Sequence, residues 1–192
     1  MKWASFNLCA SKPEEYGGYY QWAGLKDVSN TGIYLNWANC PYHIGSDYEI
    51  GWTKYIDRPN PDNKTLLDYE DDVAYVSLGD KWRIPTFAEW NELIDNCIWT
   101  WTDNFNGTGV SGYIVTSRKA NYTDKSIFLP AAGCRDDCNI YGAGSYGYYW
   151  SSSLYVGIPY SDSAYGVRLD FEHVGRFYFN RYRGLSIRSV KE

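Results

Sequence analysis

The sequence has no apolar run approaching 18 residues, and it contains only two histidines and one methionine in 192 residues. The first absence excludes a membrane-spanning helix. Residues 1–5 also lack an apolar core of signal-peptide length, so no export signal is visible in the chain. Apolar residue types make up 44% and charged types 21%, a balance typical of a folded protein. No linker or composition shift marks a domain boundary, and short strands with few helices predict one α+β domain over residues 1–192.

Sequence motifs for catalysis are also absent. The chain contains no G-x-S-x-G, P-loop, H-E-x-x-H or dinucleotide fingerprint. Cys40 and His43 could supply a nucleophile and a base, but nothing provides a third orienting group. Adjacent carboxylates, as in Asp71-Asp72, point apart on a helix or strand, whereas glycosidases need two facing carboxyls. We therefore expect no catalytic residue and no cofactor, in a protein that is not an enzyme.

Cysteine spacing gives no metal site. The five cysteines are an odd number, form no C-x-x-C motif and have no histidine placed to complete a zinc site. We expect free thiols, with Cys97 on the apolar side of a helix, and a disulfide between Cys134 and Cys138 is the alternative. Residues 103–107 resemble a calcium loop, but Phe105 occupies a ligand position, so this segment is interpreted as a turn. We expect no bound metal.

Charge and aromatic content favour recognition of a ligand. The net charge of −5 argues against nucleic acid and against an anionic membrane as partners. The chain has 9 Trp, 20 Tyr and 7 Phe, and tyrosine-rich surfaces give large contact areas at low rotamer cost. Residues 151–192 contain five arginines and one lysine, a bias that favours stacking and forked hydrogen bonds. The alternative is a loop-rich fold whose core is filled with rings.

The spacing of apolar residues predicts two helices and several short strands. A capping box formed by Thr86 and Glu89 precedes apolar residues at helical spacing, which predicts a helix over 86–96. A second helix is expected over 68–78, ended by Gly79. Its apolar residues are Val73, Tyr75, Val76 and Leu78. Strands are predicted at 112–117, 126–130, 148–153 and 167–172, with a terminal strand containing Leu185, Ile187 and Val190, and long loops at 40–66, 102–111 and 133–146.

The most distinctive motif is WRIPT at residues 82–86, followed by Glu89-Trp90. It resembles the W-R-[LIM]-P-T-x-x-E-[WL] core of bacterial C-type-lectin-like domains, which are related to the formylglycine-generating enzyme and common in surface proteins of gut Bacteroidetes. The other landmarks that look like this family are WASFNL (3–8), YGGYYQW (16–22), FLPAAG (128–133), YWSSS (149–153) and GLSIRSV (184–190). The resemblance spans nearly the whole chain. It implies a C-type-lectin-like fold, with two helices around short antiparallel strands and long loops.

The family resembled here includes enzymes, sugar binders and hypervariable receptors, so the fold alone does not give the function. Its enzymes use a cysteine pair late in the chain, and here no cysteine follows Cys138. Its calcium-dependent sugar binders use Glu-Pro-Asn or Gln-Pro-Asp with Trp-Asn-Asp. This chain has only Asn-Pro-Asp at 60–62, and its Trp-Asn-Glu at 90–92 lies within the predicted helix. Both of these activities therefore lack their residues.

The hypervariable receptors are variable proteins of diversity-generating retroelements, and the codon usage of such elements provides a test. Mutation of template adenines turns Asn codons into codons that end in a pyrimidine, which never encode Lys, Glu, Gln, Met or Trp. These five types occur 25 times in residues 1–150, but residues 151–190 contain only Glu172. The depletion supports a hypervariable, ligand-displaying region over about residues 146–184.

The resulting hypothesis divides this region into scaffold and ligand-binding residues. The scaffold residues are Trp150, Val167, Leu169, Phe171, Leu185 and Ile187. The ligand-binding residues are Tyr155, Val156, Ile158, Tyr160, Asp162, Arg168, Asp170, His173, Arg176, Phe177, Tyr178, Phe179, Tyr182 and Arg183. We expect the partner to be a protein or glycan on another cell or a phage target, and the location to be the cell surface or a phage particle. The alternative is a non-diversified adhesin or glycan-binding module of the same fold.

Overall fold

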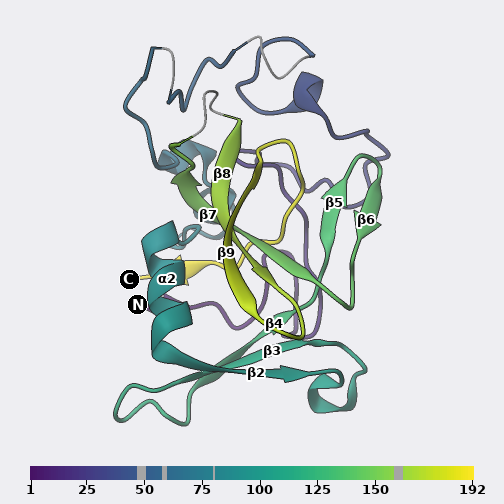
Figure 1. Ribbon diagram of the computed structural model, residues 1–192, viewed down its shortest axis with the longest axis vertical. Coiled ribbons are helices and arrows are strands. Elements are labelled where there is room, and N and C mark those ends of the chain that lie inside the picture. Colours follow the sequence, from purple (N-terminus) through teal and green to yellow (C-terminus); the bar gives the residue numbers. More distant parts are fainter. Residues whose placement is uncertain (47–50, 58–59, 80, 158–161) are drawn as a thin grey trace.

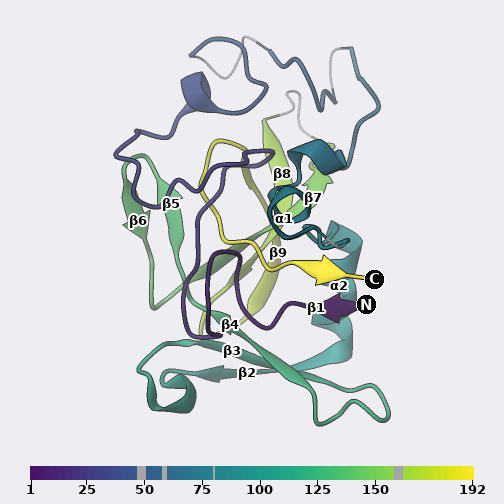
Figure 2. The same cartoon turned by 180° about the vertical axis from the view of Figure 1, so that it is seen from behind.

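The computed structural model describes residues 1–46, 51–57, 60–79, 81–157 and 162–192. Within these ranges the chain forms two α-helices and several small antiparallel sheets, which confirms the α+β class (Figure 1). The two ends of the chain lie side by side, because β1 (Lys2–Trp3) pairs with β10 (Val190–Lys191) (Figure 2). None of the helices in the described ranges is long and apolar enough to cross a bilayer.

A three-stranded antiparallel sheet forms the centre of the fold. It consists of β7 (Gly147–Leu154), β8 (Ser163–Leu169) and β9 (Val174–Asn180), with β8 in the middle. A second three-stranded sheet lies at the lower end of the molecule in Figure 1. Its strands are β2 (Cys97–Thr102), β3 (Gly112–Ser117) and β4 (Ser126–Pro130). The short hairpin of β5 (Cys134–Asp136) and β6 (Asn139–Tyr141) stands beside the central sheet.

Helix α2 (Phe87–Asn96) covers one face of the central sheet. The Thr86 hydroxyl accepts a hydrogen bond from the Glu89 N–H, and the Glu89 carboxylate accepts one from the Thr86 N–H. This confirms the predicted capping box and the helix that follows it. Trp90 on the inner side of the helix is fully buried and packs in one cluster with Val167 of β8. The helix therefore covers the centre of this face around Val167, while Arg176 and Tyr178 of β9 remain exposed.

Three buried tryptophans join the N-terminal segment, α2 and β7. The indole N–H of Trp22 donates to the Ser151 carbonyl at 2.9 Å. That of Trp90 donates to the Trp150 carbonyl at 3.1 Å, and that of Trp150 donates to the Tyr20 carbonyl at 2.7 Å. Each ring buries a large apolar surface while its single polar atom keeps a partner. Trp22 and Trp150 belong to one buried cluster and Trp90 to a second, and the indole N–H of each of the three has an acceptor.

The segment predicted as a helix over 68–78 is divided into two pieces. The 3₁₀ turn η2 (Tyr69–Asp71) precedes α1 (Val73–Leu78), and Asp72 between them is extended and caps α1. Gly79 ends the helix as predicted. The buried residues of α1 are Val73 and Ala74, whereas Tyr75, Val76 and Leu78 are exposed. The prediction was wrong because the carboxylate of Asp72 competes for the first N–H groups of the helix and interrupts the segment.

The predicted strands are confirmed at 112–117 and 126–130, and the strand predicted at 148–153 lies within β7. The strand predicted at 167–172 ends earlier, at Leu169, because Asp170 starts a turn. Phe171 lies in that turn with 68% of its surface exposed, so its predicted role in the scaffold is wrong. The other five scaffold residues are buried, as predicted. They are Trp150, Val167, Leu169, Leu185 and Ile187.

Three further features differ from the sequence-based expectation. Cys97 does not continue α2 but begins β2, a strand that was not predicted. The expected loop at 133–146 contains the hairpin β5–β6. The terminal strand is reduced to β10, and residues 184–189 are held by isolated bridges and buried side chains. All five cysteines are free thiols, as expected, so Cys134 and Cys138 form no disulfide.

Candidate functional site

The central sheet offers two faces, because successive side chains of a strand point to opposite sides. Val167 in β8 lies opposite Arg176 in β9, and Val167 packs towards α2. Arg176 therefore shares the face that α2 covers. Phe177 is one residue further along β9 and lies on the other face, with Arg168 of β8. The four consecutive positions 176–179, all predicted to bind ligand, cannot face the same partner.

We name the surface on the side away from α2 the aromatic–arginine face. Its residues are Tyr146, Tyr148, Arg168, Phe177, Tyr182 and Arg183, and all are half-buried. The Arg168 guanidinium lies 4.8 Å from the ring centroid of Tyr146 and 5.6 Å from that of Phe177. Gly175 lies opposite Arg168, and a Cβ atom there would collide with the ring of Phe177. The glycine thus lets the phenyl ring lie against the strand and contact the guanidinium.

Tyr148 lies between the arginines of this face. It pairs with Arg168 across β7 and β8, and its ring meets that of Phe179 edge-on at 5.6 Å. Burial raises the pKa of the Tyr148 hydroxyl, and the positive charges of Arg168 and Arg183 act in the opposite direction. Arg183 is itself fixed by an ion pair with Asp136 of β5 at 2.8 Å. The arginines of the face are therefore anchored before any ligand arrives.

The aromatic surface continues past β9 into the loop that follows it. The ring of Tyr182 packs edge-on against Trp37, with 4.7 Å between the centroids. Trp37 in turn contacts Trp52 at 5.9 Å, and the Arg181 guanidinium lies 3.6 Å from the Trp52 ring centroid. Stacked guanidinium and aromatic groups of this kind are stabilised by cation–π attraction. They stiffen the upper edge of the aromatic–arginine face.

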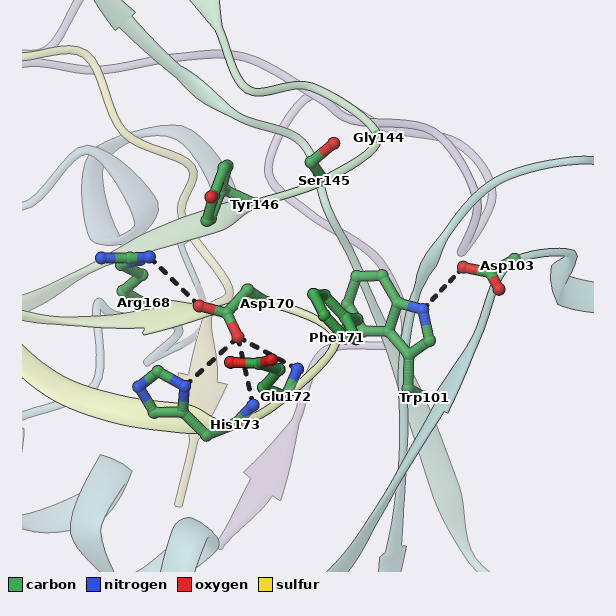
Figure 3. Close-up of a pocket in the computed structure, with 10 residues that line it drawn as sticks. All are labelled: Trp101, Asp103, Gly144, Ser145, Tyr146, Arg168, Asp170, Phe171, Glu172 and His173. Carbon is green, nitrogen blue, oxygen red and sulfur yellow. Dashed lines mark hydrogen bonds and ion pairs between the residues drawn. The ribbon is translucent and has the colours of Figure 1, made fainter.

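The turn that joins β8 to β9 is organised by Asp170. Its carboxylate accepts hydrogen bonds from the backbone N–H groups of Glu172 and His173, both at 3.1 Å, and from the Arg168 guanidinium at 3.1 Å (Figure 3). The His173 Nδ1 atom lies 3.2 Å from the same carboxylate. Burial acts to raise the pKa of Asp170, but these hydrogen bonds and charges outweigh it and lower the pKa. Asp170 thus holds the turn and the Arg168 side chain together.

A pocket of about 570 Å³ lies against this turn, and we name it the hairpin pocket (Figure 3). Its lining comes from the end of β2, the segment before β7 and the β8–β9 turn. The lining residues are Trp101, Asp103, Gly144, Ser145, Tyr146, Arg168, Asp170, Phe171, Glu172 and His173. Because Tyr146 and Arg168 belong to both, the hairpin pocket and the aromatic–arginine face form one continuous surface.

A separate group of aromatic residues lies on the α2 side of the sheet. Tyr178 stacks on Tyr155 at 4.1 Å, Tyr155 meets Tyr165 edge-on at 5.0 Å, and Tyr165 stacks on Phe87 of α2 at 4.1 Å. We name these four residues the tyrosine stack. Arg176 also turns towards the helix, where it binds the side chains of Asn91 and Asp95. Through these contacts, the side chains of the tyrosine stack and Arg176 attach β9 and the segment after β7 to α2.

The predicted ligand-binding residues are therefore distributed over several places. The aromatic–arginine face contains Arg168, Phe177, Tyr182 and Arg183, and the turn contains Asp170 and His173. The α2 side contains Tyr155, Arg176 and Tyr178, with Val156 exposed beyond the end of β7. Asp162 is half-buried beside Ser163, and burial raises its pKa. Ile158 and Tyr160 lie outside the described residues.

Two of the predicted ligand-binding residues are buried. Phe179 lies on the same face as Phe177, but it is 7% exposed because the core cluster of Trp150 and Ala164 covers its end of that face. Asp170 is 6% exposed, and its carboxylate is occupied by the turn that it organises. The prediction treated both as freely displayed side chains. In this respect it was wrong.

Sequence reasoning missed the aromatic residues that complete the site. Tyr146 and Tyr148 alternate with the buried residues Gly147 and Tyr149, a period of two that identifies one face of a strand. That signal was present and could have placed both tyrosines beside Arg168. No local pattern could have found Trp37 or Trp101, because they reach the site only through the folding of distant segments.

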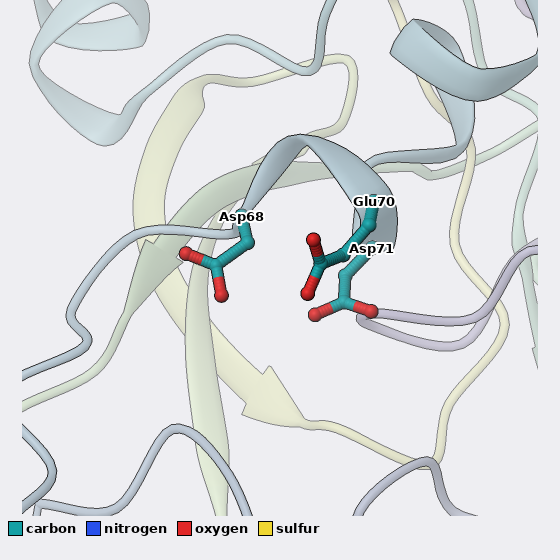
Figure 4. Close-up of side chains that lie close together, drawn as sticks. All are labelled: Asp68, Glu70 and Asp71. Carbon is teal, nitrogen blue, oxygen red and sulfur yellow. The ribbon is translucent and has the colours of Figure 1, made fainter.

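Asp68, Glu70 and Asp71 bring three carboxylates together (Figure 4). The Lys54 ammonium group already lies among them, 2.7 Å from Asp68, 3.1 Å from Glu70 and 2.6 Å from Asp71. Burial acts to raise the pKa of Asp71, but its hydrogen bonds from Lys54 and from Tyr42 and Tyr55 lower it overall. The Lys54 ammonium group thus pairs with all three carboxylates, of which Asp71 is buried and Glu70 is exposed.

Comparison with known proteins gives no neighbour for this arrangement. No family model matches the chain, and no curated protein and no solved structure matches it.

Proposed function

We propose that this protein is a receptor that binds its ligand with the aromatic–arginine face, on a C-type-lectin-like scaffold. The observation that carries the proposal is the construction of this face. Its ring and guanidinium groups stand on a sheet whose opposite face packs against α2, and Arg168 and Arg183 are held by carboxylates. Preorganised aromatic and arginine side chains bind a partner at low entropic cost, which is typical of binding hot spots.

We further propose that this face is diversified by a retroelement. Four of its residues, Arg168, Phe177, Tyr182 and Arg183, lie in the region depleted in Lys, Glu, Gln, Met and Trp. All four residue types have codons that end in a pyrimidine. Buried clusters supply the frame, and Phe177 and Tyr182 pack against two of these clusters from outside.

The ligand class that fits this face is a protein or a glycan on another cell or on a phage target. Aromatic rings supply contact area for either class, and guanidinium groups bind carboxylates and hydroxyl-bearing surfaces through several donors. The overall charge of −5 disfavours nucleic acid. The protein would thus act by binding and not by catalysis.

The proposed role of the face is tested with two matched libraries displayed on phage. One randomises Arg168, Phe177, Tyr182 and Arg183 with codons that end in a pyrimidine. The control randomises Tyr155, Tyr165, Arg176 and Tyr178 on the α2 side. Both are selected against hen egg lysozyme as the probe. We expect folded clones and lysozyme binders from the first library at a frequency at least tenfold above the control. Equal yields from the two libraries, or unfolded clones throughout the first, would contradict the proposal.

The genomic neighbourhood separates diversification from the alternative of a fixed adhesin or glycan-binding module. A retroelement requires a reverse transcriptase gene and a near-copy of the repeat that encodes the variable region, both close to this gene. Sequencing of the flanking DNA provides the measurement. Absence of both elements would leave a ligand-binding face of constant sequence.

A further inference from the structure

We infer that the hairpin pocket binds a cationic side chain of the ligand, an arginine or a lysine. This inference rests on the proposed function, because it assigns a ligand group to the end of the same surface. It also goes beyond that function. Three pocket residues, Trp101, Asp103 and Glu172, are not reached by diversification, so these three would stay constant beside a variable face that includes Arg168.

The pocket is built from parts that are distant in the sequence. Trp101 and Asp103 come from the end of β2, and the Trp101 indole N–H donates to the Asp103 carboxylate at 2.7 Å. Glu172 comes from the β8–β9 turn, and it is the one residue of 151–190 that a pyrimidine-ending codon cannot encode. Trp101 and Asp103 lie outside the depleted region altogether. These three pocket residues are therefore fixed under the proposed mechanism of diversification.

The charges in the pocket are unbalanced. Arg168 and Asp170 neutralise each other through their ion pair at 3.1 Å. Asp103 has only the neutral indole of Trp101 as a partner, and Glu172 is exposed, so neither carboxylate is paired with a cation within the described part of the chain. Two negative charges thus line a concave site that contains one neutralised arginine. This favours a positively charged ligand group.

The aromatic walls of the pocket suit the same ligand group. The Arg168 guanidinium already lies 4.8 Å from the ring centroid of Tyr146, so Trp101 and Phe171 are the rings left for a ligand. The phenyl ring of Phe171 is 68% exposed, and a ligand in the pocket would cover part of this apolar surface. The Glu172 and Asp103 carboxylates lie on opposite sides of these two rings (Figure 3), so a cationic side chain over the rings would lie between two negative charges. A sugar would need donors as well, and the guanidinium of Arg168 is already bonded to Asp170.

The test uses N-acetyl-arginine methylamide as the probe and its neutral citrulline analogue as the control. Binding to the full chain is followed by NMR on the indole N–H of Trp101, which is assigned with a Trp101→Phe variant. We expect the arginine probe to shift this resonance and to bind at least about fivefold more tightly than the citrulline probe. Asp103→Asn and Glu172→Gln should each weaken the arginine probe about threefold. Glu92→Gln, an exposed carboxylate of α2, serves as the control and should change nothing.

Three outcomes would overturn the inference. Equal affinity for arginine and citrulline would show that charge is not recognised. A response to methyl α-mannoside but not to the arginine probe would assign the pocket to sugars. If the Trp101 resonance responds to none of the probes, the pocket binds neither cationic side chains nor this sugar. The lysozyme libraries test the proposed function separately from the pocket, because they leave Asp103 and Glu172 unchanged. If the arginine probe binds while the libraries fail, only the assignment of the face is lost.

Discussion

Arg188 is fully buried, and all three of its hydrogen-bond acceptors are uncharged oxygens. Its Nε donates to the Asn7 side chain at 3.0 Å, and its two terminal nitrogens donate to the carbonyls of Ala4 at 3.2 Å and Phe128 at 2.7 Å. Burial lowers the pKa of this guanidinium to about 10. The arginine bias near the end of the chain thus has two origins. Some arginines serve the surface, and Arg188 fixes the core.

Replacement of Arg188 by Met should destabilise the protein by about 3 kcal/mol or more, because three buried acceptors lose their donor together. Urea unfolding followed by circular dichroism measures this loss. Arg176→Met is the matched control, since Arg176 is exposed and its contacts with Asp95 and Asn91 lie at the surface. It should cost about 1 kcal/mol or less. A loss at Arg188 no greater than that at Arg176 would contradict this account.

Among the elements, α2 was predictable because the signals for its start and its interior agree. The capping box marks Thr86, and the apolar residues then follow with helical spacing. The end of the helix was less clear, because Cys97 continues the apolar spacing while it starts β2. Residues 98–102 are Ile-Trp-Thr-Trp-Thr, a run of β-branched and aromatic types that favours a strand, and this signal was not used. The pairing of Cys97 with Ser117 of β3 shows where the strand begins.

The sequence predicted which residue types form the candidate site, but not how these residues are distributed over the two faces of the central sheet. The depletion of five residue types and the excess of arginine placed the site near the C-terminal end of the chain. The period of two in β9 was not applied to residues 176–179, so side chains from both faces were assigned to one surface. Pocket residues from β2 could not be predicted, because their approach depends on the packing of two separate sheets.

The cap of α2 predicts a dependence of stability on pH. Burial acts to raise the pKa of Glu89, but the Arg83 guanidinium and the Thr86 hydrogen bonds outweigh it and lower the pKa below 4.5. A carboxylate with a lower pKa in the folded state stabilises the fold above the pKa of the unfolded state. This contribution is lost as the pH falls through the pKa of the folded state. Stability should therefore decrease as the pH is lowered from about 5 to about 3.

Comparison of Glu89→Gln with the parent chain tests this origin. The variant should be less stable at pH 7, and its free energy of unfolding should fall less steeply between pH 5 and pH 3. Glu92→Gln removes an exposed carboxylate from the same helix and preserves the capping box, so its profile should follow that of the parent. Denaturant unfolding at a series of pH values provides both slopes. An unchanged slope in Glu89→Gln would assign the acid sensitivity to other groups.

At the scale of the whole molecule, the beginning of the chain completes the core formed by its end. The Ala4 N–H donates to the Ser189 carbonyl and the Leu8 N–H donates to the Ile187 carbonyl, both at 2.9 Å. Asn7 adds its contact with Arg188 between these two bonds. These contacts join residues about 180 positions apart in the sequence, and they involve buried residues of the core. We therefore expect the N-terminal segment to be required for folding of the aromatic–arginine face, although it contributes no residue to that face.

Deletion of residues 1–8 tests this dependence, because it removes the partners of 187–189 and leaves every strand of the central sheet in the chain. It also removes the contact of Asn7 with Tyr149 of β7. We expect loss of the cooperative thermal transition and of the dispersed NMR spectrum, since Ile187 and Arg188 would face solvent or remain buried without partners. Deletion of Met1 alone is the control and should shift the Tm by no more than about 2 °C, because Met1 is exposed. If the chain without residues 1–8 melted cooperatively within about 5 °C of the parent, the segment would be an appendage. The aromatic–arginine face would then be supported by the central sheet and α2 alone.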